Sequence, residues 1–424
     1  MRRVIQMAAL LALGLFALSC GGAQPLTGGD KDYDALLSMI GDARIVMLGE
    51  ATHGSREFYR ERARITRRLV EEAGFGAVVM EAPWEPVRRL DAYIRGSGGD
   101  ADAASSLGGF IRFPRWSWRN SEVRDFVEAL RAINLARAPT AEPLRLYGMD
   151  IYSVPESADA VVRHLARRSG EAATLARQRY ACFSDYLDEP MLYGREVESG
   201  RAASCAEGAA AQLAEMAAET REEDDFAAWQ SARVVRNGEA YYRAIYHEGT
   251  ISWNLREQHL ADTLIQLLER MGAAGKIVVW AHNSHQGDAR ESDQGAVGEL
   301  SLGQLMRERY GENAVLVGFS TYRGHVRAAA EWGAQDRVWR LRPALRQSWH
   351  ERLHRLGLPR LMLIFRGNPA LAEKFAERRL ERVVGVSYVP GDERNSHYRH
   401  SHLSRQFDAI IHIDVTSAVD SLPR

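Results

Sequence analysis

Short, nearly continuous apolar runs recur along the chain, and longer segments with helical spacing of apolar residues separate many of them. Runs rich in Val, Ile, Leu and Met are typical of strands buried on both faces of a parallel sheet. The predicted strands are Arg44–Leu48, Ala77–Met80, Leu144–Met149, Lys276–Ala281, Ala314–Phe319, Leu361–Phe365, Arg382–Val386 and Ala409–Ile413. Helical patterns include Ser55–Ala73 and Glu122–Ala136. This alternation predicts an α/β fold with a mostly parallel central sheet flanked by helices.

The strand pattern stops between about Pro155 and Leu268. This stretch is rich in Ala, Glu and Arg at helical spacing, as in Ala206–Thr220 and Phe226–Tyr246. We therefore expect an all-helical lobe to be inserted into an α/β catalytic core. The predicted boundaries are 155–268 for the lobe, and 33–154 with 269–424 for the core.

The first twenty residues have the pattern of a secretory signal. Arg2 and Arg3 precede an apolar run of about 15 residues, which is shorter than the ~20 that a spanning helix needs. The ending Ala17-Leu18-Ser19-Cys20 resembles a bacterial lipobox, in which Cys20 becomes the lipidated first residue. We expect residues 1–20 to be a lipoprotein signal peptide and residues 21–32 a flexible tether. The protein would then be a membrane-anchored lipoprotein of the bacterial cell envelope, periplasmic or surface-exposed, with plain secretion and an uncleaved anchor as alternatives.

Charge and cysteine content narrow the choice of partners. The 55 Lys and Arg side chains nearly balance 56 Asp and Glu, for a net charge of −1, so no overall field attracts a polyanion and no nucleic-acid partner is expected.

Besides Cys20 the chain has only Cys182 and Cys205, which lie in the predicted lobe. In an oxidising compartment they could form a disulfide, and two buried thiols are the other possibility.

Acidic and imidazole side chains follow four of the predicted strands. The carboxyl ends of parallel strands meet at one edge of a sheet, where such sheets bind ligands. The strand-end residues with suitable chemistry are Glu50, His53, Glu81, Asp150, His282 and His285. We predict that they share one active site, with Gly49 and Gly54 permitting a tight turn around the first motif.

These residue types suit general acid–base chemistry, because imidazole titrates near neutrality and a carboxylate can orient it. The same groups could instead bind a metal ion. The chain has no GxSxG or P-loop motif. His350-Glu351-Arg352-Leu353-His354 fits HExxH, but Arg352 interrupts the apolar pattern of a zinc peptidase helix, which favours a solvated helix face.

Other histidines carry weaker signals. His397, His400 and His402 lie close together in sequence, and His397 is a candidate for approaching the site. His412, inside an apolar strand, is interpreted as a core histidine.

Several motifs together resemble the erythromycin esterase family. They are Gly49-Glu50-Ala51-Thr52-His53-Gly54, the strand end at Glu81, the Trp-rich segment Arg115–Val123, Asn254–Ala261, Trp280–His285 and Gln406–Asp414. The blocks occur in the same order from about residue 33 to the end of the chain. The resemblance implies an α/β sheet with a helical lobe and metal-independent hydrolysis of a lactone.

The resemblance also implies roles for individual residues. It places the general base at His53, its glutamates at Glu50 and Glu81, the helix arginine at Arg62, and the histidine pair at His282 and His285. The residues alone could not distinguish Arg62 from Arg56, Arg60 and Arg64 on the same predicted helix. We expect Arg62, His282 and His285 to stabilise the oxyanion.

The expected substrate is a small-molecule carboxylic ester or lactone, and no cofactor is expected. Candidate substrate-binding or supporting residues are Trp84, Trp116, Trp118, Tyr152, Asp150, Arg256 and Trp253. Two other functions stay open from the sequence. One is a metal-dependent hydrolase that uses the same His and Glu cluster, and the other is a non-catalytic ligand-binding surface lipoprotein.

Overall fold

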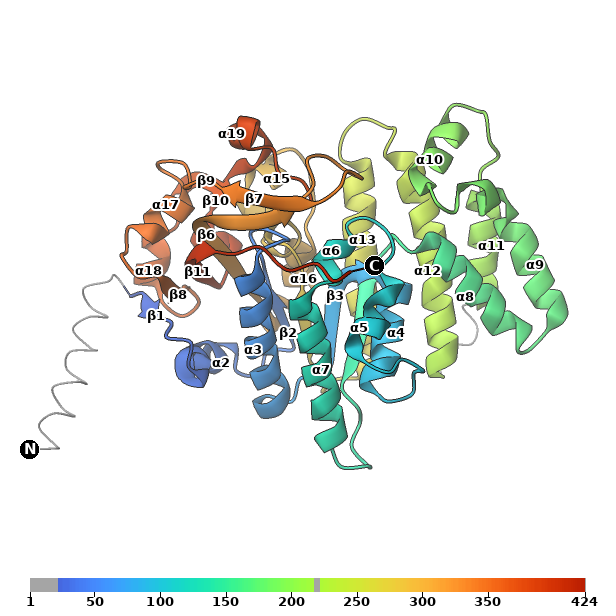
Figure 1. Ribbon diagram of the computed structural model, residues 1–424, viewed down its shortest axis with the longest axis horizontal. Coiled ribbons are helices and arrows are strands. Elements are labelled where there is room, and N and C mark those ends of the chain that lie inside the picture. Colours follow the sequence, from blue (N-terminus) through green and yellow to red (C-terminus); the bar gives the residue numbers. More distant parts are fainter. Residues whose placement is uncertain (1–21, 217–221, 424) are drawn as a thin grey trace, which may run out of the picture.

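The computed structural model describes residues 22–216 and 222–423 (Figure 1). The predicted signal peptide and Cys20 lie outside the described residues. Within those two ranges, no helix combines the length and the apolar character needed to cross a membrane.

A mixed sheet of nine strands forms the centre of the molecule. Its strand order is β1-β8-β11-β6-β2-β5-β3-β4, and β7 pairs with β6. The six strands from β11 to β4 are parallel to one another, whereas β1, β8 and β7 are antiparallel to their neighbours. The strands are β1 (Gln24–Pro25), β2 (Ile45–Leu48), β3 (Ala77–Pro83), β4 (Arg145–Asp150), β5 (Ile277–Trp280), β6 (Ala314–Ala328), β7 (Arg337–Leu341), β8 (Arg360–Ile364) and β11 (Ala409–Thr416). The α/β class with a mostly parallel sheet is confirmed.

Helices cover both faces of this sheet. The helices longer than six residues are α2 (Asp34–Ile40), α3 (Arg56–Glu72), α4 (Trp84–Ile94), α7 (Ser121–Ala136), α8 (Val154–Ala166), α9 (Gly170–Tyr180), α10 (Pro190–Glu198), α11 (Ala206–Met216), α12 (Glu223–Ala244), α13 (Ile251–Met271) and α16 (Leu302–Tyr310). Shorter helices include α5 (Ala103–Ser106), α6 (Arg115–Trp118), α14 (Asn283–Gln286), α15 (Asp293–Ala296), α17 (Trp349–His354), α18 (Pro369–Lys374), α19 (Glu393–Ser396) and α20 (Leu403–Gln406).

Alternation along each strand divides the core into two apolar clusters. Met47 and Val279 face a cluster with α13 and α16, whereas Val46 and Val278 face the other cluster with α3 and α7. Successive residues of a strand point to opposite faces, so a sheet with helices on both sides needs apolar residues at every position. This is why its strands are continuous apolar runs.

Between β4 and β5 the described residues form helices and no strand. Figure 1 shows α8 to α12 gathered at the end of the molecule opposite β1 and β8. Their apolar side chains belong to the same cluster as Met47 and Val279, so this helical segment shares a core with the sheet.

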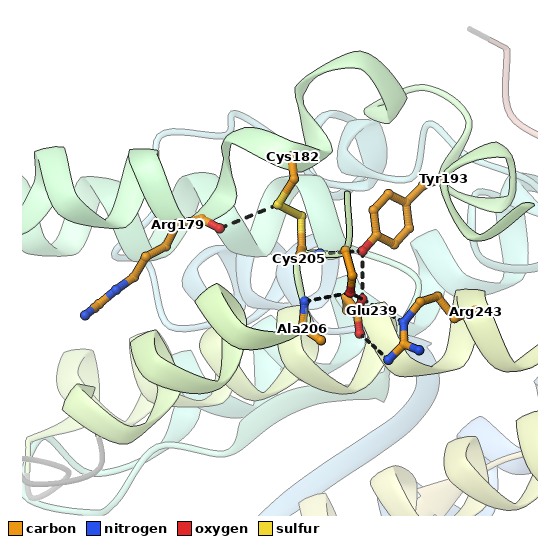
Figure 2. The surroundings of a disulfide bond; sticks show 8 residues. Arg179, Cys182, Tyr193, Cys205, Ala206, Glu239 and Arg243 are labelled. Carbon is orange, nitrogen blue, oxygen red and sulfur yellow. Dashed lines mark hydrogen bonds and ion pairs between the residues drawn. A yellow bond between two sulfur atoms is a disulfide. The ribbon is translucent and has the colours of Figure 1, made fainter. Parts of the chain in front are cut away.

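The structure joins Cys182 and Cys205 in a disulfide, with a Cα–Cα distance of 5.7 Å (Figure 2). The Tyr193 hydroxyl beside it accepts from the Cys205 N–H at 2.8 Å and donates to Glu239 of α12 at 2.7 Å. The disulfide therefore joins the residues after α9 to the start of α11, and the Tyr193–Glu239 hydrogen bond ties this segment to the long helix α12. Of the two possibilities left open by the sequence, the structure has the pair rather than the free thiols.

Two expectations from the sequence are wrong. Residues 22–32 are not a free tether, because Gln24–Pro25 pairs with β8 and Ala23 is buried against the core. Arg382–Val386 is not a strand of the main sheet. Instead β9 (Arg378–Arg382) pairs with β10 (Tyr398–His402) in a separate two-stranded ribbon.

Candidate active site

The site forms where four neighbouring parallel strands end. In the order β2-β5-β3-β4, these strands carry Glu50 and His53 just after β2, His282 and His285 after β5, Glu81 near the end of β3 and Asp150 at the end of β4. A continuous set of contacts links all six predicted residues. Glu50 contacts His53, whose ring lies against His282, and the His282 N–H donates to Glu81. Glu81 in turn contacts His285, and Arg256 joins Glu81 to Asp150. The carboxyl edge of the sheet thus collects residues that are up to 235 positions apart in sequence.

Two glycines allow the turn after β2 to pack closely. A Cβ at Gly49 would lie 2.2 Å from side-chain atoms of Asn283 and Gln286, and a Cβ at Gly54 would lie 1.9 Å from the carbonyl oxygen of Arg327. No larger residue fits without displacing its neighbours. The turn therefore fixes the backbone on both sides of His53.

Glu50 connects His53 to Arg62. One Glu50 oxygen lies 2.6 Å from His53 Nδ1, and the other accepts from Arg62 Nη2 at 2.7 Å. Arg62 comes from α3, is fully buried, and its guanidinium lies over the rings of Tyr59 and Trp280 at 4.5 and 4.7 Å. Arg62 does not line the cavity, so it supports Glu50 and is not placed to contact an oxyanion as we expected from the sequence.

Arg256 of α13 binds the two carboxylates at the ends of β3 and β4. Its Nε and Nη2 donate to the two oxygens of Asp150 at 3.0 and 2.6 Å, and Nη2 also donates to Glu81 at 2.8 Å. Burial raises the pKa of Glu81, but attraction to His285 and Arg256 outweighs it and holds that pKa well below its usual range. Glu81 is thus ionised at neutral pH, and the Arg256 guanidinium holds both carboxylates in place.

His285 lies between two carboxylates. Its Nδ1 is 2.5 Å from Glu257 and its Nε2 is 3.1 Å from Glu81, while the Trp253 ring stacks on it at 4.8 Å. Burial lowers the pKa of His285, but Glu257 and Glu81 outweigh burial and raise it to about 9.

Sequence reasoning missed Glu257. It lies three residues before Leu260 and therefore on the apolar face of α13. A charged residue on such a face is a signal of a buried polar contact.

His282 presents a free ring N–H. Its Nδ1 accepts from the Ser284 N–H at 3.3 Å, which leaves the proton on Nε2. This Nε2 is buried and has no hydrogen-bond partner within residues 22–216 and 222–423, and the ring lies 4.7 Å from the His53 ring. Burial and the nearby His53 hold the pKa of His282 well below its usual range, so the ring is neutral at neutral pH.

A cavity of about 850 Å³ opens beside this cluster. His53, Glu81, Asp150, His282 and His285 line one side of it. Aromatic residues line other parts: Phe110, Phe113, Trp118, Tyr152, Tyr241, Trp253 and Trp332. The volume falls within the range of small-molecule sites.

The structure corrects two of the predicted substrate contacts. Trp84 packs against Tyr147 and Phe226, and Trp116 belongs to the apolar cluster on the α3 side of the sheet. Neither residue lines the cavity. Both are core residues because α4 and α6 turn these side chains toward the sheet rather than toward the cavity.

The HExxH histidines do not face each other. His350 is buried, its Nδ1 lies 3.0 Å from the Thr321 carbonyl, and its Nε2 accepts from the Arg382 N–H at 2.8 Å. His354 instead stacks on Tyr322 and contacts Asp414. Both nitrogens of His350 are therefore engaged within the fold.

The remaining candidate histidines fall in different places. His397 lines the cavity, while its Nε2 accepts from the Val389 N–H at 2.9 Å. His400 contacts Asp293 and His402 contacts the Ala376 carbonyl. His412 is fully buried and bonds Ser320, which confirms it as a core histidine.

A mostly parallel sheet with a His and Glu cluster at its carboxyl edge is the arrangement expected of the erythromycin esterase family, and the chain belongs to this family. The erythromycin esterase family model matches residues 70–416. Membership supports a hydrolase of the ester or lactone type.

Individual relatives span most of the chain. Erythromycin esterase type II of Escherichia coli is 22% identical over 420 residues, which cover 91% of this chain and 93% of that protein. Erythromycin esterase type I of Escherichia coli is 22% identical over 300 residues, covering 67% and 72%.

Solved structures share the fold at low identity. A Bacillus cereus protein has a TM-score of 0.79 at 20% identity, covering 97% of this chain and 99% of that one. A succinoglycan biosynthesis protein has a TM-score of 0.78 at 22% identity with the same coverage. A mutant of the erythromycin esterase EreC in its open conformation has a TM-score of 0.65 at 17% identity, covering 93% and 95%.

Proposed function

We propose that this protein hydrolyses a carboxylic ester or lactone with a water molecule activated by His53. The observation that carries the proposal is the bond between His53 Nδ1 and Glu50 at 2.6 Å, beside the cavity that His53 lines. Nδ1–H donates to the carboxylate, so Nε2 is left as the basic nitrogen available to a molecule in the cavity.

Glu50 and Arg62 support the base. When His53 takes a proton from water, the imidazolium gains a direct ion pair with Glu50. Arg62 holds the Glu50 carboxylate in place through its 2.7 Å bond. General base catalysis of this kind typically contributes a factor of ~10²–10⁴.

His282 is proposed as the donor to the developing oxyanion. Its Nε2–H has no partner among the described residues, and its ring lies next to His53. A preorganised neutral donor at this point stabilises negative charge that appears only in the transition state, an effect of about 2.7–4 kcal/mol per donor. The Glu81 carboxylate holds the His282 backbone by accepting its N–H at 2.8 Å.

The charges of the cluster favour direct activation of water over activation by a metal ion. Glu81 and Asp150 already bind Arg256, and both nitrogens of His285 contact carboxylates. A divalent cation would have to displace the Arg256 guanidinium, which is buried with them. His53 is therefore assigned as the base rather than as a ligand.

The proposed substrate is an ester or lactone with a bulky apolar part. The cavity volume of about 850 Å³ and its aromatic lining support a ligand of this kind. Two relatives are named erythromycin esterases, so a macrolide lactone belongs in the panel of test substrates.

We also propose that the protein is a lipoprotein of the cell envelope, with lipid on Cys20. The basic and apolar start of the chain and the Cys182–Cys205 disulfide support an oxidising compartment. Labelling with a radioactive fatty acid should mark the wild type and leave Cys20→Ser unmarked. Equal labelling of both proteins contradicts the assignment.

The hydrolase proposal is tested with purified protein, a panel of aryl esters, alkyl lactones and a macrolide, and pH-stat detection of the acid released. His53→Gln should lower kcat by at least ~100-fold. The matched control is His247→Gln, because the His247 side chain is half exposed on the helical segment, where it contacts Glu198. Unchanged activity in His53→Gln refutes the assignment of His53 as the base. If EDTA abolishes the activity of the wild type and added zinc restores it, the water is activated by a metal ion instead. Ligand binding without turnover supports a binding protein instead.

A further inference from the structure

A second pair of histidine and carboxylate lies across the cluster from His53 and Glu50. Glu257 of α13 is fully buried, and its two oxygens have different partners. One is 2.5 Å from His285 Nδ1, and the other accepts from the N–H of Leu302, the first residue of α16, at 2.8 Å. Two helices therefore fix this carboxylate, and the carboxylate in turn fixes the ring.

The His285 ring is held on all sides. Trp253 stacks on its face with an angle of 11° between the rings. The Nε2 of His285 lies 2.9 Å from Arg256 Nη1 and 3.1 Å from Glu81. The charged or titratable groups that face the ring are Glu257 and Arg256 from α13, Glu81 from β3, and His282, the residue just before α14, with Asp150 of β4 behind Arg256.

We infer that Glu257 is a positioning residue that acts through His285: its carboxylate holds the Nδ1–H and so fixes the ring with Nε2 between Glu81 and Arg256. The effect on turnover rests on the proposed hydrolase function. The effect on the protonation of His285 does not.

These contacts also connect Glu257 to His282, the proposed oxyanion donor. His285 and Arg256 neutralise one oxygen of Glu81, and the other oxygen accepts from the His282 N–H at 2.8 Å. A chain of contacts thus runs from Glu257 through His285 and Glu81 to His282. If Glu257 lost its charge, His285 would release its second proton more easily, and Glu81 would lose one of the two cations that hold it.

The direct test is titration of the His285 ring by ¹⁵N NMR in wild type and Glu257→Gln, without substrate. Glutamine keeps an oxygen that can accept from Nδ1–H but removes the charge. We expect the midpoint of the His285 titration to fall by about 1–3 pH units, the range for loss of a neighbouring opposite charge. Glu257→Asp, which keeps the charge, should titrate closer to the wild type.

A matched control separates this effect from a general loss of a buried carboxylate. Glu239 of α12 is also buried, and it bonds Tyr193 and Arg243 without touching the cavity histidines. Glu239→Gln should leave the His285 titration unchanged, even if it lowers stability by a similar amount. For a substrate that the wild type hydrolyses, the alkaline limb of kcat/KM should move to lower pH in Glu257→Gln and not in Glu239→Gln.

An unchanged His285 titration in folded Glu257→Gln overturns the inference. If that variant does not fold, a wild-type-like titration in Glu257→Asp supports the inference and a shift as large as the one expected for glutamine contradicts it. If the wild type hydrolyses none of the esters in the panel, the proposed function fails, but the substrate-free titration still decides the role of Glu257.

Discussion

Replacing Arg62 by methionine would remove the cation from a carboxylate that is shielded from water. Arg62 and Glu50 are 0% and 1% exposed, and their Nη2–Oε2 distance is 2.7 Å. Removing one partner of a buried ion pair typically costs about 3–5 kcal/mol, because the other charge is left without compensation. Methionine retains much of the side-chain length and volume between Tyr59 and Trp280, so the lost charge dominates. We expect the free energy of unfolding to fall by about 3–5 kcal/mol in Arg62→Met.

The assay is urea denaturation followed by tryptophan fluorescence and circular dichroism, with the midpoint and slope compared between variants. Arg60→Met is the matched control on the same helix. Its side chain is 60% exposed and lies 3.6 Å from Glu122, which also pairs with Arg56, so its loss should cost less than about 1 kcal/mol.

A double variant tests the reason for the loss. Glu50→Gln combined with Arg62→Met removes both charges, so it should be more stable than Arg62→Met alone. The reasoning is refuted if Arg62→Met and Arg60→Met lose similar amounts, or if adding Glu50→Gln destabilises Arg62→Met further.

Three more outcomes follow from the structure. Folding raises the pKa of His285 from 6.5 to about 9, so its stabilisation is complete below pH 6.5 and is lost as pH rises through 9. At 1.36 kcal/mol per pKa unit, the free energy of unfolding should fall between pH 6.5 and pH 9 by up to about 3 kcal/mol more in the wild type than in His285→Gln. An equal dependence of stability on pH in the two proteins would contradict this prediction. Reducing the Cys182–Cys205 disulfide, whose cysteines are 23 positions apart, should lower stability by about 3 kcal/mol in the chain-entropy model, and a Cys182→Ala/Cys205→Ala variant should show no response to reductant. The Trp332 ring lies 5.0 Å from the Phe113 ring, and both line the cavity. Trp332→Ala should therefore raise KM roughly 3- to 10-fold for bulky esters while kcat stays unchanged. An equal rise in KM for small esters would argue against a role of Trp332 in binding the bulky part of the substrate.

The convergence of Glu81, Asp150 and His282 was predictable from the sequence. Strands buried on both faces have a distinctive apolar pattern, and such strands pair in parallel. Parallel strands place their carboxyl ends at one edge, so a polar residue after each strand must arrive there. Local pattern and one general rule of topology were sufficient for this part of the site.

Arg62 shows where that reasoning ends. Arg56, Arg60 and Arg64 occur on the same helix, and only packing shows that one of these four arginines is enclosed between two aromatic rings and Glu50. Family resemblance pointed to Arg62, but the oxyanion contact that we expected of it has no support in the structure, because Arg62 is fully buried and does not line the cavity.

The predicted tryptophan contacts failed for a related reason. Trp84 and Trp116 have the same chemistry as Trp118, yet they face the core while Trp118 faces the cavity. A side chain's direction on a short helix depends on how that helix docks, which no local pattern specifies. The strand predicted at Arg382–Val386 failed likewise, because the partner of β9 is β10 and not the central sheet.

The sequence by itself determined the two-sided sheet, the helical segment between β4 and β5, and the edge at which the polar groups meet. Only the tertiary structure decided which of those groups touch, that Glu257 lies behind His285, and that Cys182 and Cys205 are paired. Secondary structure follows from periodicity within a dozen residues, whereas a buried charge depends on partners contributed by distant segments. Glu257 on α13 and Glu81 on β3 reach opposite nitrogens of one ring only because the whole chain has folded around it.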